Sequence, residues 1–190
     1  GRMRIICHEE QMPVLIGELA VHRLDLVLAD SPIPSGMNVR CFSHPLGRSP
    51  LACFASPLLI KLFPGRFPDC LHDAPLLLPT DTASGLRTEL LSWLARMGIS
   101  MRISGEFDDS ALLQAFGSEG HGFFFAPSAI RDEICAKYDV QCIGEVTELV
   151  QEFYAVSAER KISHKAVKLI TDNVTAALIG PAAAGGNPQN

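Results

Sequence analysis

Short apolar runs alternate with segments whose apolar residues recur every three or four positions. Between about residues 75 and 149 the short runs predict strands and the helical spacing predicts helices. The expected strands are Pro75–Pro79, Met101–Phe107, Phe123–Pro127 and Val140–Gly144, and the expected helices are Ser84–Met97, Ala111–Phe116 and Ser128–Tyr138. This alternation favours mainly parallel sheets with helices on their faces.

The two ends of the chain carry a similar pattern. The expected strands are Arg4–His8, Leu24–Asp30, Asn38–His44, Leu51–Ala55 and Leu149–Ser157, and the expected helices are Glu10–His22 and a last one from a Ser163 cap to about Leu178. We therefore expect an α/β protein of two Rossmann-like lobes. Residues 1–56 with 150–180 form the first lobe, residues 57–149 form the second, and residues 181–190 form a disordered tail. A ligand cleft is expected at the carboxyl ends of the strands.

Composition restricts the class of protein. The chain has 190 residues, 47% of them hydrophobic and 19% charged, which is typical of a folded globular protein. A formal net charge of −5 disfavours direct binding to nucleic acid. The six cysteines form no C-x-x-C pair, and no apolar run is long enough to cross a bilayer. These features favour reduced thiols, a cytoplasmic location and no membrane partner.

The apparent catalytic motifs have simpler interpretations. Asp108 and Asp109 are adjacent, so they cannot easily flank one scissile bond, and a helix-capping role is favoured. Gly117, Gly120 and Gly122 lie between a helix and a strand and predict a tight turn, because a phosphate loop would follow a strand and open a helix. No nucleophile with a base and an orienting group is evident. The pattern therefore favours binding over catalysis, with no catalytic residue and no cofactor.

Polar or backbone groups at the ends of expected strands are the candidate binding residues. In the first lobe they lie at or just after the end of the strand that ends near residue 30. In the second lobe they lie at or near the ends of the strands that end near residues 79, 107 and 127. The set is Asp30, Ser31, Thr80, Asp81, Ser84, Gly85, Glu106, Ala126 and Pro127. Together they offer hydroxyls, carboxylates and backbone N–H groups, which suit a small ligand.

Several longer motifs resemble a known family. The runs are "CHE", "HRLDLVLADSP", "GEFDDSALLQAFG", "FFFAP" and "EFYAVSAERKISHKAV", and the likeness extends to about Leu178. They resemble the effector-binding domain of LysR-type transcriptional regulators. The "GEFDD…AFG" run narrows the likeness to members that activate the gene of a sodium/proton antiporter.

The resemblance implies an architecture and a set of partners. It implies two α/β subdomains joined by two crossover strands, like a type 2 periplasmic binding protein. Family members bind an effector in the cleft, form dimers or tetramers, and reach promoter DNA through an N-terminal winged helix-turn-helix. From the resemblance we expect that DNA-binding domain to be missing from this sequence, together with the first strand and helix of the first subdomain.

The narrower resemblance implies a response to sodium or to a small inducer. Sodium is a hard cation that prefers oxygen ligands, so Asp30, Thr80, Asp81 and Glu106 are the side chains to test. Asp30 and Asp81 are the possible sodium ligands, and no firm metal site is predicted. The alternatives are a solute-binding protein of a transport system and, less favoured, an enzyme.

The sequence predicts that this chain alone does not recognise duplex DNA. It carries a net charge of −5 and lacks the reading helix, so the phosphate contacts that drive such binding are missing. Fluorescence anisotropy with a promoter fragment at low and moderate salt measures this. Tight, salt-sensitive binding would contradict the interpretation of the chain as a sensor.

Overall fold

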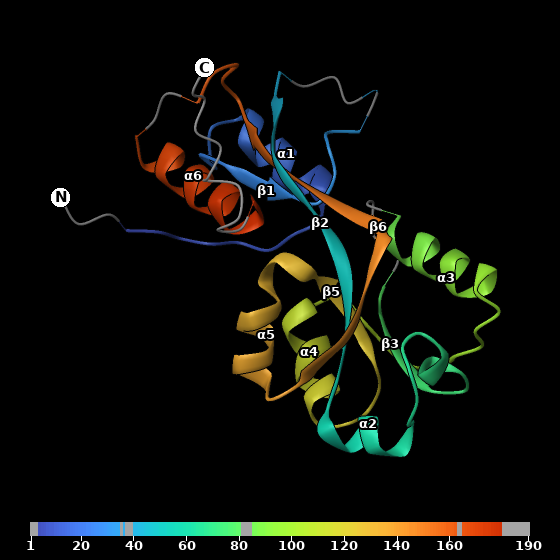
Figure 1. Cartoon of the computed structure of the whole chain (residues 1–190). Coiled ribbons are helices and arrows are strands. Elements are labelled where there is room, and N and C mark those ends of the chain that lie inside the picture. The colour runs from blue at the N-terminus through green and yellow to red at the C-terminus, as the bar shows by residue number, and fades with distance from the viewer. Residues whose placement is uncertain (1–3, 35, 37–39, 81–84, 163–164, 180–190) are drawn as a thin grey trace, which may run out of the picture. The chain divides into compact units, whose positions relative to one another are not determined.

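The structure, a computed structural model, describes residues 4–34, 36, 40–80, 85–162 and 165–179 (Figure 1). The chain forms two compact units. Unit 1 is Gly1–Arg48 with Glu152–Asn190, and unit 2 is Ser49–Gln151. The chain passes from one unit to the other along two long strands, β2 (Phe42–Ala55) and β6 (Gln141–Ser157).

Unit 1 contains α1 (Met12–Ala20), β1 (Val27–Ala29) and α6 (Lys165–Ile179). Helix α1 begins with a proline in its first turn, where the missing N–H costs nothing. Strand β1 runs antiparallel to β6, with Val27 opposite Val156. These two valines pack with Ile16 and Leu19 of α1, which lie three positions apart on one helix face. This cluster is the hydrophobic core of unit 1 in the described chain.

Unit 2 alternates strands and helices. In chain order it contains α2 (Pro57–Leu62), the 3-10 turn η1 (Asp69–Leu71), β3 (Pro75–Pro79), α3 (Leu86–Arg96), β4 (Arg102–Phe107), α4 (Ser110–Ser118), β5 (Phe124–Pro127), the 3-10 turn η2 (Ser128–Ile130) and α5 (Arg131–Tyr138). Strands β3 and β4 are parallel, and β5 runs antiparallel to β2. Strands β1, β6, β2 and β5 are hydrogen-bonded to one another in that order.

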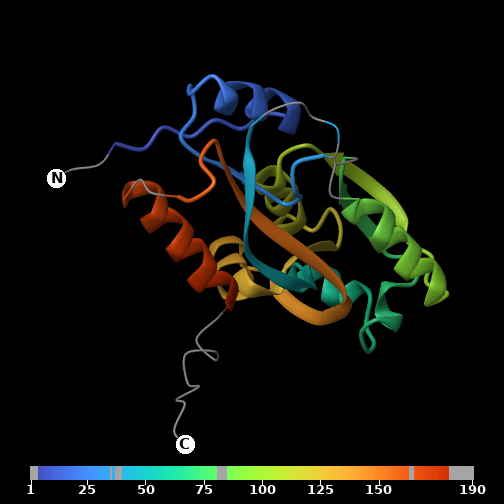
Figure 2. The same cartoon turned by 90° about the horizontal axis from the view of Figure 1, so that it is seen from above.

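Helices cover both faces of the central strands of unit 2. Leu76 and Leu78 of β3 pack with Trp93 of α3 in one core cluster, whereas Leu77 packs in a second cluster with Leu113 of α4. Alternate residues of a strand point to opposite faces, so a run of buried leucines requires cover on both sides. Figures 1 and 2 show α3 on one side of the unit 2 strands and α4 with α5 on the other.

The structure confirms most expected elements of the second half of the chain. The strands expected at residues 75–79, 101–107 and 123–127 correspond to β3, β4 and β5, and the helices expected around them correspond to α3, α4 and η2 with α5. Helix α1 lies within the expected residues 10–22, and β1 is shorter than the expected strand. The Ser163 cap and the tail at 181–190 lie outside the described residues.

Other expectations were wrong. Arg4–His8 forms no regular structure, and its apolar side chains are exposed, because no strand pairs with it in the described chain. The strands expected at 38–44 and 51–55 are one strand, β2, and those expected at 140–144 and 149–157 are one strand, β6. The sheets are not mainly parallel: of the pairings described here, β1–β6 and β2–β5 are antiparallel. The expected division into residues 1–56 with 150–180 and residues 57–149 stays a prediction.

Two helical glycines give a matched test of core packing. A Cβ at Gly117 of α4 would lie 2.3 Å from Cδ1 of Phe124, so Gly117→Ala should destabilise the protein by about 1–3 kcal/mol. A Cβ at Gly17 of α1 would meet nothing within 4 Å, so Gly17→Ala should stabilise by about 0.5–1 kcal/mol. Urea unfolding of both variants measures the effects, and equal signs would contradict the close packing of α4 on β5.

Candidate functional site

The candidate site in unit 2 lies where the parallel strands β3 and β4 end. Thr80 follows β3, and its backbone N–H donates to the carbonyl oxygen of Phe107 at 2.9 Å. Its hydroxyl donates to Oδ1 of Asp108, the first residue after β4. The two strand ends are therefore joined by a backbone bond and a side-chain bond. Asp108 is exposed, so its carboxylate can also contact a solute.

An ion pair lies beside these strand ends. Nη2 of Arg87, in the first turn of α3, donates to Oε1 of Glu106 at 2.6 Å, and Nη1 donates to the carbonyl oxygen of Pro79 at 3.3 Å. The Arg87 side chain is 21% exposed and that of Glu106 is 45% exposed. Glu106, a predicted ligand, is thus already neutralised by a guanidinium, which weakens its attraction for a cation.

The adjacent aspartates 108 and 109 have different roles. Oδ1 of Asp109 accepts bonds from the backbone N–H groups of Ala111 at 2.7 Å and Leu112 at 3.3 Å. Asp109 is therefore the N-cap of α4, as the sequence predicted. Asp108 makes no such cap and accepts the Thr80 hydroxyl instead. The capping interpretation is confirmed for Asp109 and corrected for Asp108.

The end of β5 is held by a buried serine. Oγ of Ser49 accepts the backbone N–H of Ala129 at 3.0 Å and donates to the carbonyl oxygen of Pro50 at 3.0 Å. Ser49 is only 1% exposed, so these bonds satisfy a hydroxyl that would otherwise be costly to bury. Of the two predicted residues here, Ala126 is buried in the core and Pro127 is half-buried. Ala126 therefore offers little side-chain surface to a ligand.

The other predicted residues that the structure describes follow β1 or precede α3. Asp30 and Ser31 follow β1 in unit 1, and both are half-buried. Gly85 is the N-cap of α3 with φ +70°, a conformation that favours glycine, and a Cβ there would meet nothing within 4 Å. Asp81 and Ser84 lie outside the described residues. Unit 2 therefore brings Thr80 and Glu106 to one edge, and the role of the whole set remains a prediction.

Sequence reasoning missed three residues that hold the strand ends of unit 2. Arg87, Asp108 and Ser49 were not predicted as site residues, although Arg87 could have been found as a cation in the first turn of a helix that follows a strand.

No cluster of three or more His, Cys, Asp or Glu side chains suited to a metal is found among the residues that the structure describes. In the same residues, no helix is both long and apolar enough to span a membrane.

The cysteines support a structural role for most thiols. All six are free, and five are at least partly buried. Burial raises the pKa of the Cys53 thiol well above its ordinary value, and the nearby Cys70 and Cys142 raise it further. A thiol with a raised pKa is a poor nucleophile at neutral pH, so Cys53 is suited to packing rather than to covalent chemistry.

Comparison with known proteins identifies related sequences. The family described as "LysR substrate binding domain" matches residues 2–178. Two curated proteins, each named transcriptional activator protein NhaR, from Escherichia coli (strain K12) and Shigella flexneri, are 36% identical over 177 residues. The match covers 93% of this chain and 57% of each relative, so the chain spans little more than half of their length.

Solved structures show the same fold. The regulatory domain of HypT from Salmonella typhimurium has a TM-score of 0.61 at 18% identity, covering 89% of this chain and 81% of that one. The regulatory domain of Synechocystis PCC6803 CcmR, in complex with 2-PG, has a TM-score of 0.57 at 15% identity, covering 87% and 78%. The expected fold class is confirmed: α/β, of the type 2 periplasmic-binding-protein kind.

The different roles of the two aspartates predict different effects on stability. Asp109→Ala removes the cap of α4 and should destabilise unit 2 by about 1 kcal/mol. Asp108→Ala removes one exposed hydrogen bond and should change stability by no more than about 0.5 kcal/mol. Urea unfolding followed by circular dichroism measures both. A loss in Asp108→Ala as large as in Asp109→Ala would contradict the assignment of the cap.

Proposed function

This chain belongs to the LysR substrate-binding-domain family, and on that premise we propose that it is the effector-sensing domain of a bacterial transcriptional activator. The observation that carries the proposal is the family match over residues 2–178, together with 36% identity to the NhaR activators over 93% of the chain. In this proposal the protein regulates transcription in the cytoplasm and does not catalyse a reaction. DNA binding belongs to a domain outside this chain.

We further propose that the regulated gene encodes a sodium/proton antiporter and that sodium or a small inducer is the effector. At the β3 and β4 ends, the Thr80 hydroxyl and the exposed Asp108 carboxylate offer oxygen atoms, which a hard cation prefers. Arg87 and Glu106 favour a different ligand, because an anionic inducer could replace Glu106 on the guanidinium. Asp30 and Asp81 remain proposed contributors to a sodium site.

Self-association into dimers or tetramers is also part of the proposal. Apolar side chains of unit 2 are exposed on two neighbouring elements, Ile103 of β4 at 44% and Leu112 and Phe116 of α4 at 49% and 41%. Strand β4 pairs with β3, and no other strand is hydrogen-bonded to it among the described residues. A strand edge beside exposed apolar groups is a favourable surface for another protein chain.

A sodium titration tests the effector. If sodium binds the folded state, a concentration about fivefold above the dissociation constant stabilises by about 1 kcal/mol and raises Tm by about 2–4 °C. Potassium chloride at equal ionic strength is the control, because it matches the screening but not the ion size. Asp30→Asn or Asp108→Asn should reduce the sodium response, as measured by thermal unfolding.

The same experiment separates the effector from the domain assignment. Equal shifts with sodium and potassium, or full shifts in both variants, would exclude a sodium site involving these carboxylates. That outcome leaves a small inducer as the effector, and the family membership stands. Of these two carboxylates, Asp108 belongs to unit 2 and Asp30 to unit 1, so a loss confined to Asp108→Asn would support a site in unit 2.

A further inference from the structure

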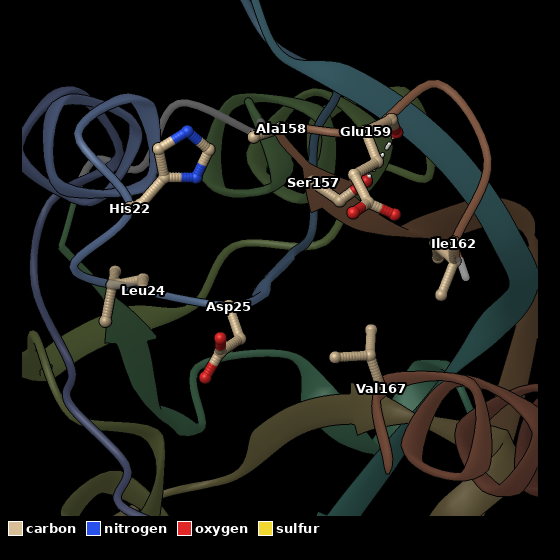
Figure 3. Close-up of a pocket in the computed structure, with 8 residues that line it drawn as sticks. All are labelled: His22, Leu24, Asp25, Ser157, Ala158, Glu159, Ile162 and Val167. Atoms are coloured by element: carbon tan, nitrogen blue, oxygen red, sulfur yellow. Dashed lines mark hydrogen bonds between the residues drawn. The ribbon is translucent and has the colours of Figure 1, made fainter. Parts of the chain in front are cut away.

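The cavity of unit 1 has its most buried polar group already bonded. It is lined by residues from the end of α1, the connection to β1, the end of β6 and the start of α6, and its volume is about 160 Å³ (Figure 3). Oγ of Ser157 donates its proton to the carbonyl oxygen of Glu159 at 2.7 Å and lies 3.0 Å from Nε2 of His44. Ser157 therefore has no free proton for a ligand. The exposed apolar surface of unit 2 is the stronger candidate for binding.

Helix α2 exposes two of its leucines. Leu59 is 3% exposed and packs in the core of unit 2, whereas Leu58 and Leu62 are 58% and 62% exposed. Residues four apart on a helix share a face, so these two side chains lie together on the solvent side of α2. Exposed leucines that lie together favour cover by another protein surface.

This apolar surface continues onto the end of α4. A Cβ placed on Gly120, which follows α4, would lie 3.6 Å from Cδ2 of Leu58. The ring of the next residue, His121, contacts the ring of Phe116 with the centroids 5.3 Å apart. Phe116 is 41% exposed, and Leu112, one turn earlier on α4, is 49% exposed. Figure 1 shows the end of α4 beside α2. We call this exposed set the α2–α4 patch: Leu58, Leu62, Leu112, Phe116 and His121.

Two side chains of opposite charge adjoin the patch. Lys61 lies on α2 between Leu58 and Leu62, and Glu119 directly precedes Gly120 at the end of α4. Both are exposed, and neither makes an ion pair among the residues that the structure describes. The patch therefore has an unpaired cation on its α2 side and an unpaired anion on its α4 side.

We propose that the α2–α4 patch binds the same patch of a second copy of this chain across a two-fold axis. The inference rests on the self-association proposed above and names the surface that forms it. A two-fold contact is self-complementary, so α2 of each copy packs against α4 of the other. Lys61 of each copy then lies opposite Glu119 of the other while the apolar side chains are covered. A partner of uniform charge would instead meet one like charge.

Sedimentation velocity of the 190-residue chain tests the contact. Five side chains are fewer than the about 20–30 residues per side of a stable interface, so we expect a weak dimer with a dissociation constant on the order of 100 µM. Leu58→Ser and Leu62→Ser should each raise that constant about tenfold. Met97→Ser is the matched control, because Met97 is 48% exposed but lies at the end of α3, outside the patch. Circular dichroism checks that each variant is folded.

A charge exchange tests the two-fold arrangement. Lys61→Glu and Glu119→Lys should each weaken the dimer about fivefold, because each variant sets like charges opposite one another at two places. An equimolar mixture of the two variants should regain wild-type association. In the mixed dimer, each position 61 again faces a position 119 of opposite charge. A change in folding alone would not be repaired by mixing.

The outcomes separate this inference from the proposal on which it rests. A wild-type chain that stays monomeric at every concentration would overturn both. A wild-type dimer that is unchanged by Leu58→Ser and Leu62→Ser, or charge variants that mixing does not restore, would overturn the α2–α4 contact alone. A dimer weakened only by Ile103→Ser would overturn it too, since that result places the contact on the edge of β4.

Discussion

The buried pair Phe123–Phe124 joins the β3–β4 sheet to the sheet that contains β2 and β5, and each of the two large core clusters of unit 2 contains one residue of the pair. Phe123 bonds to β3: its N–H donates to the carbonyl oxygen of Pro75 at 2.8 Å, and its carbonyl oxygen accepts the N–H of Leu77 at 2.9 Å. The next residue pairs with β2 instead, where Phe124 lies opposite Phe54 and stacks on its ring at 5.4 Å between centroids. Two adjacent residues therefore connect β3 to β2, and neither can move without breaking a sheet.

The apolar runs of unit 2 predicted its strands well, because the strands that meet at Phe123 and Phe124 are buried. Strands buried on both faces are continuous apolar runs, and "PLLLP" and "FFFAP" show this directly. The patterns failed along β2 and β6, because Pro45 and Pro50 in β2 and Gly144 in β6 resemble breaks. In the fold each proline costs the strand one donor, and Gly144 is needed because a Cβ there would lie 2.2 Å from Phe67. Packing against distant residues decided these positions.

Among the described residues, the hydrophobic core of unit 1 is smaller than that of unit 2. Its described core is Ile16, Leu19, Val27 and Val156, whereas unit 2 has two larger clusters. Ile5 and Ile6 are 58% and 63% exposed, although their sequence is typical of a strand. The strand predicted there was wrong, because a strand is stable only when it is paired with another. Local sequence cannot show whether a partner is within reach, and so this prediction failed.

The edge of the candidate site depends on a change of register that no sequence pattern shows. Pro75 of β3 lies opposite Arg102 of β4, but the register shifts between Leu76 and Leu77, and Ser104 is the extra residue. The Ser104 hydroxyl shares its one proton between the carbonyl oxygens of Leu76 at 3.2 Å and His121 at 2.9 Å, which holds the bulge in place. Without the shift, continuing the first pairing would set Thr80 opposite Phe107. With it, Thr80 lies beside Asp108, and its hydroxyl bonds to that carboxylate. Strand ends could be predicted from the sequence, but their partners across the sheet could not.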